Sequence, residues 1–394
     1  MMQLLAQKLI QKLMQAGTCM TTLLLCLMIL AGNKAIASEY LVETYAQGLD
    51  RPWSLAFLPD RSILVSELVG QFRIVNPDGT VSKPLQGTPE VVYRSQGGLS
   101  DVILDPDYQS NQRIYFSYSG RDEVSGRLTL YIASARLNRA ALALEDVTVL
   151  FQAKALRRAN VHYGAKLAFL ADGTLVIASG DGFDHREQAQ RLDNHFGKMI
   201  RINRDGSVPS DNPFIGKEGA LSDIYSYGHR NQQGLVVLPD GALLSHEHGP
   251  RGGDELNRIE PGRNYGWPAI TYGIDYSGAM ISPFTEMQGM EQPLKYWVPS
   301  IAPAGLAYMH QSSQFPSWNG SFFVAGLVPG DVRRLWKGRD GSYHEDTLLE
   351  ELGTRIRNIY VTPEGTLMAV TDDAKTSASG GGRLLLIKPI KPQQ

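Results

Sequence analysis

The sequence predicts an all-β protein with a six-bladed β-propeller fold. A short apolar strand, a turn containing Pro, Asp or Gly, and a second apolar strand recur six times, at intervals of roughly 45 to 70 residues. Helical periodicity is almost absent after the first 37 residues. Repeats of this length are typical of propeller blades, whose ring closure removes exposed sheet edges. A pair of β-sandwiches is the alternative, but that fold gives no reason for six copies of one hairpin.

Each repeat is a hairpin whose turn residues explain its shape. Glycine supplies the positive φ that the D-G and P-D-G turns need, and proline fixes the entry into the turn. Most of the hairpins are followed by another apolar strand, such as LTLYIASARL or GKMIRI. The six repeats begin at Trp53, Leu99, Ala165, Gln233, Ala304 and Arg357.

The N-terminal 37 residues have the pattern of a secretory signal peptide. Two lysines precede the apolar run TTLLLCLMILAG, and Ala35 and Ala37 place small residues at the −3 and −1 positions. The run is short for a membrane span. We therefore expect cleavage after Ala37, a periplasmic protein, and a single propeller domain over residues 38–394. An uncleaved N-terminal anchor is the alternative.

Cysteine content and charge further restrict the class of protein to which the chain could belong. Both cysteines, Cys19 and Cys26, lie in the leader, so the mature chain would carry no thiol and no disulfide. The formal net charge is −2, and 43% of the residues are apolar. This composition indicates a globular protein without the basic surface that nucleic-acid binding requires.

Polar motifs flank the repeats, where loops at one mouth of a propeller can meet. In their order and amino-acid sequence these motifs resemble those of the soluble aldose sugar dehydrogenases that use pyrroloquinoline quinone (PQQ), the soluble quinoprotein glucose/sorbosone dehydrogenase-like family. The resemblance runs from about Leu49 to the C-terminus, and that family has six-bladed propellers, in agreement with the repeat count. The motifs are QGG (96–98), HYGAKLAF (162–169), YGHRN (227–231), EHGPRGGDELN (247–257), NYGWP (264–268), YGIDYSG (272–278), PSIAPAG (299–305) and RIR (355–357).

PQQ is a flat quinone with three carboxylates, so its site needs cations, a platform for the ring and a Lewis acid at the reactive carbonyl. The planar fork of arginine binds a carboxylate at two points. Without its motif, Arg230 would be read as a surface salt-bridge residue. Val328 stands where the family commonly has a lysine or another polar group. The resemblance assigns cofactor contacts to Gln96, Arg230, Asn231, Tyr276, Gly326, Leu327, Val328, Arg355, Ile356 and Arg357.

The glycine-rich run suggests a calcium site, because calcium takes oxygen ligands that include backbone carbonyls. The resemblance implies that the carbonyls of Gly249 and Pro250 hold the calcium that bridges to PQQ. It places a second calcium at Glu255 and Tyr265. From the residues alone, a tight loop with solvated acids remains the alternative.

The resemblance makes His162 the catalytic base. Oxidation of an aldose at C1 to a lactone removes the hydroxyl proton and passes a hydride to the quinone, and neutral imidazole suits proton removal near pH 7. Taken alone, a single histidine before a strand is more often structural. His229 and His248 match cofactor-loop positions instead. Electrons would leave through a soluble or membrane-linked acceptor.

Two other classes stay open at this point: a calcium-dependent propeller lactonase and a non-catalytic binding propeller. A lactonase would hold its metal mainly with Asp, Asn and Glu side chains from several blades, and a binding propeller would need no base. The combined arginine and Gly-Pro set disfavours both classes. The chain contains no HExxH, CxxC or GxSxG motif, so zinc hydrolysis and serine esterase chemistry lack support.

Overall fold

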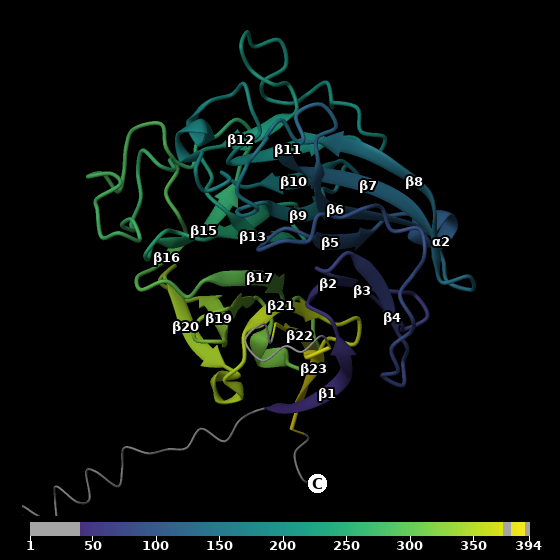
Figure 1. The fold of residues 1–394 in the computed structure, drawn as a ribbon. Coiled ribbons are helices and arrows are strands. Elements are labelled where there is room, and N and C mark those ends of the chain that lie inside the picture. Colours follow the sequence, from purple (N-terminus) through teal and green to yellow (C-terminus); the bar gives the residue numbers. More distant parts are fainter. Residues whose placement is uncertain (1–39, 373–379, 391–394) are drawn as a thin grey trace, which may run out of the picture. The chain divides into compact units, whose positions relative to one another are not determined.

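The computed structural model describes residues 40–372 and 380–390, and residues 42–388 form one compact unit. Six antiparallel sheets form this unit, which confirms the predicted six-bladed propeller (Figure 1). The predicted signal peptide, residues 1–37, lies outside the described residues.

The first three blades follow the chain in order. They are β2 (Pro52–Phe57), β3 (Ile63–Glu67) and β4 (Gln71–Val75); β5 (Leu99–Leu104), β6 (Arg113–Arg121), β7 (Leu128–Asn138) and β8 (Ala143–Gln152); and β9 (Gly164–Phe169), β10 (Leu175–Ser179), β11 (Lys198–Ile202) and β12 (Ile224–Tyr227).

The last three blades continue the pattern. They are β13 (Gln232–Val237), β14 (Leu243–Glu247), β15 (Asp254–Ile259) and β16 (Lys295–Trp297); β17 (Pro303–Tyr308), β18 (Phe322–Gly326), β19 (Val332–Lys337) and β20 (Tyr343–Leu348); and β21 (Ile356–Val361), β22 (Leu367–Thr371) and β23 (Gly382–Pro389) with β1 (Tyr40–Leu49).

Helices are few and short in the part of the chain that the structure describes. They are α2 (Tyr108–Asn111) and the 3-10 turns η1 (Arg186–Gln190), η2 (Pro316–Trp318) and η3 (Glu350–Leu352). Within residues 40–372 and 380–390, none is long and apolar enough to cross a membrane.

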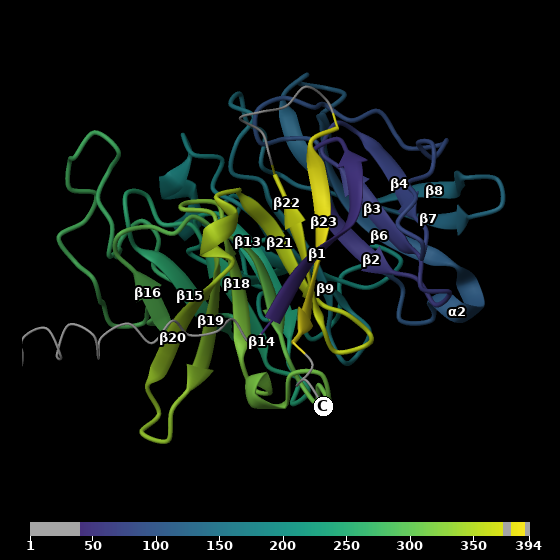
Figure 2. The same cartoon turned by 90° about the horizontal axis from the view of Figure 1, so that it is seen from below.

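Strands from both ends of the sequence close the ring. β1 is the outer strand of the sixth blade, where it pairs with β23, so one sheet joins the beginning and the end of the described chain. Figure 2 shows β1 alongside β23 and β22. Lys388 Nζ and Glu43 Oε2 form an ion pair 2.6 Å apart across this junction. This pairing gives the sixth blade its outer strand and closes the ring of six blades that the repeat pattern predicted.

The first strand of blades one to five, and β21 in the sixth, lines the centre of the ring. Each of these inner strands (β2, β5, β9, β13, β17 and β21) packs beside the next. The second strand of most blades is buried along its whole length, as in ILVSE of β3 and LVIAS of β10. Such strands begin with apolar residues and are buried throughout, because neighbouring blades cover both faces. Phe72 and Phe116 illustrate the packing between blades, with ring centroids 5.3 Å apart in an edge-to-face contact.

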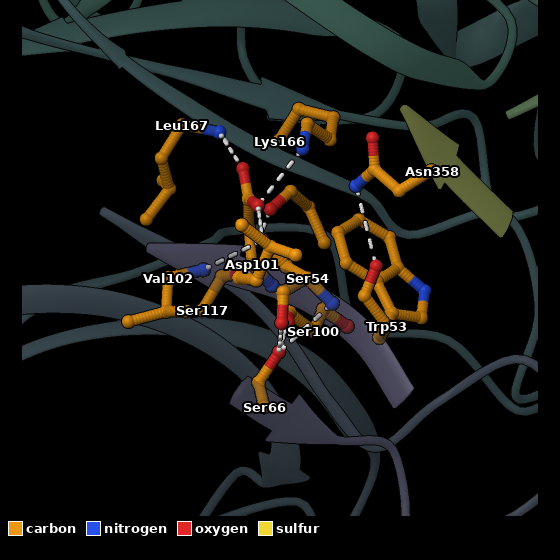
Figure 3. A network of polar contacts seen from close by, with 12 residues as sticks. Trp53, Ser54, Ser66, Ser100, Asp101, Val102, Ser117, Lys166, Leu167 and Asn358 are labelled. Atoms are coloured by element: carbon orange, nitrogen blue, oxygen red, sulfur yellow. Dashed lines mark hydrogen bonds and ion pairs between the residues drawn. The ribbon is translucent and has the colours of Figure 1, made fainter. Parts of the chain in front are cut away.

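A buried polar network ties four inner strands together (Figure 3). Asp101 on β5 accepts hydrogen bonds from Lys166 Nζ and the Leu167 amide of β9, both at 2.8 Å, and from Ser54 Oγ of β2 at 2.5 Å. Tyr360 on β21 lies 2.9 Å from Ser54 Oγ. Removing one partner of a buried ion pair leaves an uncompensated charge, at a cost of about 3–5 kcal/mol. The network therefore holds in place the inner strands that carry the site.

Candidate active site

The candidate site is built from residues that immediately precede the inner strands. At four of these bends a non-glycine residue has a positive φ: Arg51 (53°), Ser95 (54°), His162 (50°) and Ala302 (47°). The bends turn the chain from one blade into the inner strand of the next, so their side chains gather at one mouth of the central channel. Arg51, Asn231, Ala302 and Arg355 directly precede β2, β13, β17 and β21, whereas Gln96 and His162 lie in the bends shortly before β5 and β9.

A cavity of about 230 Å³, here called the central cavity, lies at this mouth. It brings together five of the residues that the motifs predicted: Gln96, Asn231, Leu327, Arg355 and Arg357. Sequence reasoning missed several of its other lining residues, among them Arg51, Trp53, Tyr163, Gln233 and Asp372.

The central cavity carries an excess of positive charge. Among its lining residues, three are arginines (Arg51, Arg355 and Arg357) and Asp372 is the sole acid. The Asp372 carboxylate lies 3.2 Å from Arg51 Nε, 3.8 Å from Arg355 Nε and 3.6 Å from Arg357 Nη2. Burial lowers the pKa of Arg357, and the charges of Arg355 and Arg51 lower it further. A cavity with this balance favours an anionic ligand.

His162 and Asp181 form a buried pair beside the central cavity. His162 Nδ1 donates to Asp181 Oδ1 at 2.8 Å. The Asp181 carboxylate also accepts hydrogen bonds from Trp267 Nε1 at 2.8 Å and the Phe183 amide at 2.9 Å. With Nδ1 donating, the Nε2 of a neutral imidazole is the acceptor. The pair therefore has the base-and-orienter arrangement of hydrolase triads, with the nitrogen that can take a proton facing away from Asp181.

Electrostatics keep this histidine neutral. Burial lowers the pKa of His162, and the charges of Arg230 and Arg157 add to that effect against the opposing contact with Asp181. Burial raises the pKa of Asp181, but the hydrogen bond from His162 and the Arg230 charge outweigh it, so the pKa lies below the usual value. Near pH 7 the pair is thus neutral imidazole beside an ionised carboxylate, the state that a general base requires.

The backbone of His162 is held on both sides. Its N–H donates to Gln96 Oε1 at 2.8 Å, and its carbonyl accepts a hydrogen bond from Arg157 Nη1 at 2.7 Å. Arg157 is fully buried, and its guanidinium lies 4.3 Å from the centre of the Tyr163 ring. A Cβ on Gly180 would lie 2.2 Å from the His162 carbonyl oxygen, so this position requires glycine. The "GDG" that precedes Phe183 was the available sequence signal for Asp181; nothing in the sequence marked Arg157.

A second cavity of about 290 Å³, here called the lateral cavity, lies beside Asp181. Its lining includes Arg230, Pro250 and Tyr276, all predicted, as well as Phe183 and Trp267. The Arg230 guanidinium lies 5.3 Å from the Trp267 ring centre and 6.0 Å from that of Tyr276. Tyr276 is 58% exposed. Arg230 thus has aromatic surfaces beside its charge, and the cavity offers a flat, partly open surface.

Arg230 also connects the lateral cavity to the glycine-rich loop. Its Nη1 donates to the carbonyl oxygens of Gly249 at 2.7 Å and His248 at 3.0 Å. The loop itself is tight, because a Cβ on Gly249 would lie 2.3 Å from the Gly252 carbonyl oxygen. The predicted loop carbonyls therefore lie next to the predicted cofactor arginine.

Two carboxylates meet behind this loop. Glu247 on β14 is the register partner of Glu255 on β15, and both line a small cavity with Gly249 and Tyr265. Burial raises the pKa of Glu255, and the neighbouring Glu247 charge raises it further. The Tyr265 hydroxyl donates to the Arg258 carbonyl at 2.6 Å and accepts from the Glu260 amide at 2.8 Å. That hydroxyl is committed, so Tyr265 could offer a cation only its backbone carbonyl.

The described residues contain no cluster of three or more His, Cys, Asp or Glu side chains placed to hold a metal ion. A cation near Glu247 and Glu255 would therefore draw its remaining ligands from carbonyl oxygens. This is a donor set that calcium accepts readily and zinc does not.

Three predicted cofactor residues stand apart from the central and lateral cavities. Ile356 is fully buried at the start of β21, and the Gly326 amide donates to the Asp331 carbonyl at the end of β18. Val328 is 54% exposed. Neither the central nor the lateral cavity is lined by any of the three.

The other motif histidines have different surroundings from His162. His248 Nε2 donates to the Pro303 carbonyl at 2.7 Å, and His229 Nε2 lies 2.8 Å from Ser226 Oγ. His229 Nδ1 is 3.5 Å from Glu247 Oε1. Among these three histidines, His162 alone has a carboxylate at hydrogen-bond distance.

Known proteins are similar to this chain in both sequence and fold. A family model described as Glucose / Sorbosone dehydrogenase matches residues 49–385. Aldose sugar dehydrogenase YliI from Escherichia coli (strain K12) is 38% identical over 354 residues, which make up 88% of this chain and 92% of that protein. These matches confirm the resemblance that the motifs indicated.

Solved structures of similar proteins agree with this family assignment. The crystal structure of the soluble aldose sugar dehydrogenase from Escherichia coli in the apo-form has a TM-score of 0.84 and 37% identity, covering 89% of this chain and 100% of its own. The structure of the PQQ-bound form of aldose sugar dehydrogenase from Streptomyces coelicolor has a TM-score of 0.72 and 29% identity, covering 89% of this chain and 98% of its own.

Proposed function

The chain belongs to the glucose/sorbosone dehydrogenase family, and from that premise we propose that it oxidises aldose sugars at C1 to lactones, with PQQ and calcium as cofactors. The observation that carries the proposal is the buried His162–Asp181 pair, which lies beside an arginine-rich cavity and an aromatic one. A base, anion-binding groups and a flat surface are the three features that this chemistry needs.

The residues present fit PQQ. Arg355 and Arg357 of the central cavity supply cations for its carboxylates, while Gln96 and Asn231 supply polar contacts. Arg230, the neighbour of Asn231 in the chain, lines the lateral cavity, whose aromatic residues suit a planar ring. When bound, PQQ would accept the hydride that leaves C1, with calcium polarising the quinone carbonyl.

The residues also fit calcium. The carbonyl oxygens of Gly249 and Pro250 would serve the ion next to the cofactor. Glu255 and the Tyr265 carbonyl would serve a second ion, with Glu247 close enough to contribute. Oxygen-only ligands with several carbonyls are typical of calcium.

His162 performs the proton transfer in this mechanism. Its Nε2 takes the proton of the C1 hydroxyl, and Asp181 stabilises the resulting imidazolium through Nδ1–H. Gln96 and Arg157 hold the His162 backbone and so fix the direction of Nε2. Trp267 and Phe183 hold the carboxylate of Asp181 in turn.

We expect the substrate to be a small-molecule sugar and the electrons to pass to a soluble or membrane-linked acceptor in the periplasm. The lactonase alternative is disfavoured, because Asp372 is the sole acid among the residues that line the central cavity. The binding-propeller alternative gives no role to the His162–Asp181 pair.

Reconstitution tests the proposed function. Chelator-treated protein is expected to be inactive and to regain dye-linked aldose oxidation only when PQQ and calcium are both added. NAD should not replace PQQ, because the sequence has no G-x-G-x-x-G dinucleotide-binding motif. Near-ultraviolet absorption of the reloaded protein gives a second measure of cofactor uptake. Activity restored by NAD, or full activity after exhaustive calcium removal, would contradict the proposal.

Calcium binding at Glu255 should appear as a change in thermal stability. With calcium at about 100 times its Kd, a single site stabilises the folded state by about 2.7 kcal/mol, which raises the melting temperature by roughly 4 °C in a domain of this size. The variant Glu255→Gln should lose most of this calcium-dependent rise, because it removes a charged oxygen ligand.

Glu218→Gln is the matched control, since it removes one charge from an exposed position. It should show the full rise. A Glu255→Gln protein whose melting temperature responds to calcium as strongly as the wild type would show that the ion is not held there.

A further inference from the structure

We propose that Arg51 is a third anion-binding arginine of the central cavity, in addition to Arg355 and Arg357, and that Asp372 positions it. The inference rests on the proposed function, because the ligand it assigns to Arg51 is a carboxylate of PQQ. Arg51 belongs to none of the motifs that carried the family resemblance, so only its place in the folded chain points to it.

The first argument is position. Arg51 precedes the inner strand β2 of the first blade in the same way that Arg355 precedes β21 of the last blade. Both side chains line the central cavity with Gln96 and Asn231, which come from corresponding bends. These bends supply Gln96, Asn231 and Arg355 to the proposed cofactor site, and Arg51 is their counterpart in the first blade.

The second argument is backbone conformation. Arg51 has a φ of 53°, a left-handed value that disfavours a residue with a Cβ. Its carbonyl accepts a hydrogen bond from the Leu68 amide at 2.8 Å, so the bend is fixed by the surrounding chain. Glycine or asparagine would suit this bend better. An arginine here calls for a role of its side chain, and the side chain enters the cavity.

The third argument is that Arg51 retains hydrogen-bonding capacity. Its Nε is 3.2 Å from Asp372 Oδ1 but lacks hydrogen-bond alignment with any acceptor in the described structure. Its Nη1 donates to the Tyr93 hydroxyl at 3.3 Å, a long contact with a neutral group. The side chain is 25% exposed. Asp372 thus lies close enough to attract the guanidinium, while its Nε–H lacks a hydrogen-bond partner and the side chain is partly exposed.

The fourth argument is charge. Asp372 is shared by three guanidinium groups, and its distances to Arg355 and Arg357 both exceed 3.5 Å. One carboxylate cannot neutralise three cations, so the lining keeps an excess of two positive charges. A ligand with three carboxylates complements that excess, and each guanidinium can meet a carboxylate through a charge-assisted hydrogen bond.

Binding of PQQ to the calcium-loaded, cofactor-free protein tests this role without relying on activity. Titration calorimetry would compare wild type, Arg51→Ala and Arg127→Ala. Arg127 is exposed and lines neither cavity, so its replacement removes the same charge elsewhere. We expect Arg51→Ala to raise the Kd for PQQ by about 10- to 100-fold, the usual worth of a hydrogen bond to a charged group, and Arg127→Ala to change it less than about twofold.

The outcomes separate this inference from the function on which it rests. If wild type binds PQQ and folded Arg51→Ala binds it equally well, the role of Arg51 is overturned and the cofactor assignment stands. If folded wild type fails to bind PQQ, the proposed function falls and the role of Arg51 falls with it. If Arg51→Ala does not fold, Arg51→Gln is the variant to measure, because glutamine is neutral and of similar length. Weaker binding of PQQ by Arg51→Gln would support the role of Arg51, and wild-type affinity would overturn it.

Discussion

Replacing His162 with alanine is expected to lower kcat for aldose oxidation by about 10²- to 10⁴-fold, the usual contribution of a positioned general base. Binding of PQQ should stay close to normal, because the imidazole is paired with Asp181 and lines neither of the cavities that hold the arginines. Single-turnover kinetics with saturating PQQ would measure the proton-transfer step, and calorimetry would measure cofactor affinity.

Asp181→Asn provides an independent check on the same pair. Asp181 accepts hydrogen bonds from His162, Trp267 and the Phe183 amide, and an amide group would place a donor against one of these donors. The wrong histidine tautomer and a lower kcat should follow. A His162→Ala protein that kept near-wild-type turnover with bound PQQ would refute the role of this histidine as the base.

The pH dependence follows from the same pair. Burial lowers the pKa of His162 below its usual value near 6.5, so the imidazole is already neutral at pH 7. In wild type, kcat should therefore be level above pH 7 and fall only when the pH drops below the ordinary histidine range. That acid-side fall should be missing from the residual activity of His162→Ala.

Replacing Arg230 with alanine is expected to act on cofactor retention first, raising the Kd for PQQ by about 10- to 100-fold. Arg230 faces the aromatic surfaces of Trp267 and Tyr276 and donates to the Gly249 carbonyl, so its loss removes a cation and also frees the loop assigned to calcium. With PQQ saturating, kcat should fall less than in His162→Ala, since the proposed partner of Arg230 is a carboxylate and not the reacting carbon.

Arg263→Ala is the comparison for Arg230→Ala. Arg263 is 63% exposed and lies 3.5 Å from Glu291, outside both cavities. It should leave the affinity for PQQ unchanged. Equal affinities of Arg230→Ala and Arg263→Ala for PQQ would remove Arg230 from the cofactor site.

Much of the fold could be predicted from the sequence, because its units are local. The D-G and P-D-G turns fix each hairpin within a few residues. The second strand of most blades, such as ILVSE of β3, begins with apolar residues because blades cover both of its faces. Six copies of one local unit can close into a ring in only a few ways. The sequence did not reveal that β1 would complete the sixth blade beside β23, since that pairing joins opposite ends of the chain.

The candidate site could likewise be predicted in part from the sequence. Motifs in the sequence led to His162, Arg230 and the Gly249–Pro250 loop, because each motif is a short segment at one bend. Of four predicted cofactor residues, Leu327 lines the central cavity, whereas Gly326, Val328 and Ile356 line neither the central nor the lateral cavity. A run of consecutive residues alternates its side chains across a strand end, so neighbours in sequence need not face the same space.

The sequence by itself determined the blades, their number and the segments at the channel mouth, because turn chemistry and apolar patterning act over a few residues. Only the tertiary structure decided that Asp181 would orient His162, that Arg157 would hold its carbonyl, and that Arg51 would meet Asp372. The His162–Asp181 and Arg51–Asp372 contacts join side chains from different bends, whereas Arg157 reaches a backbone carbonyl within its own segment. Their geometry comes from closure of the ring and from packing between blades, and no local pattern in the sequence records it.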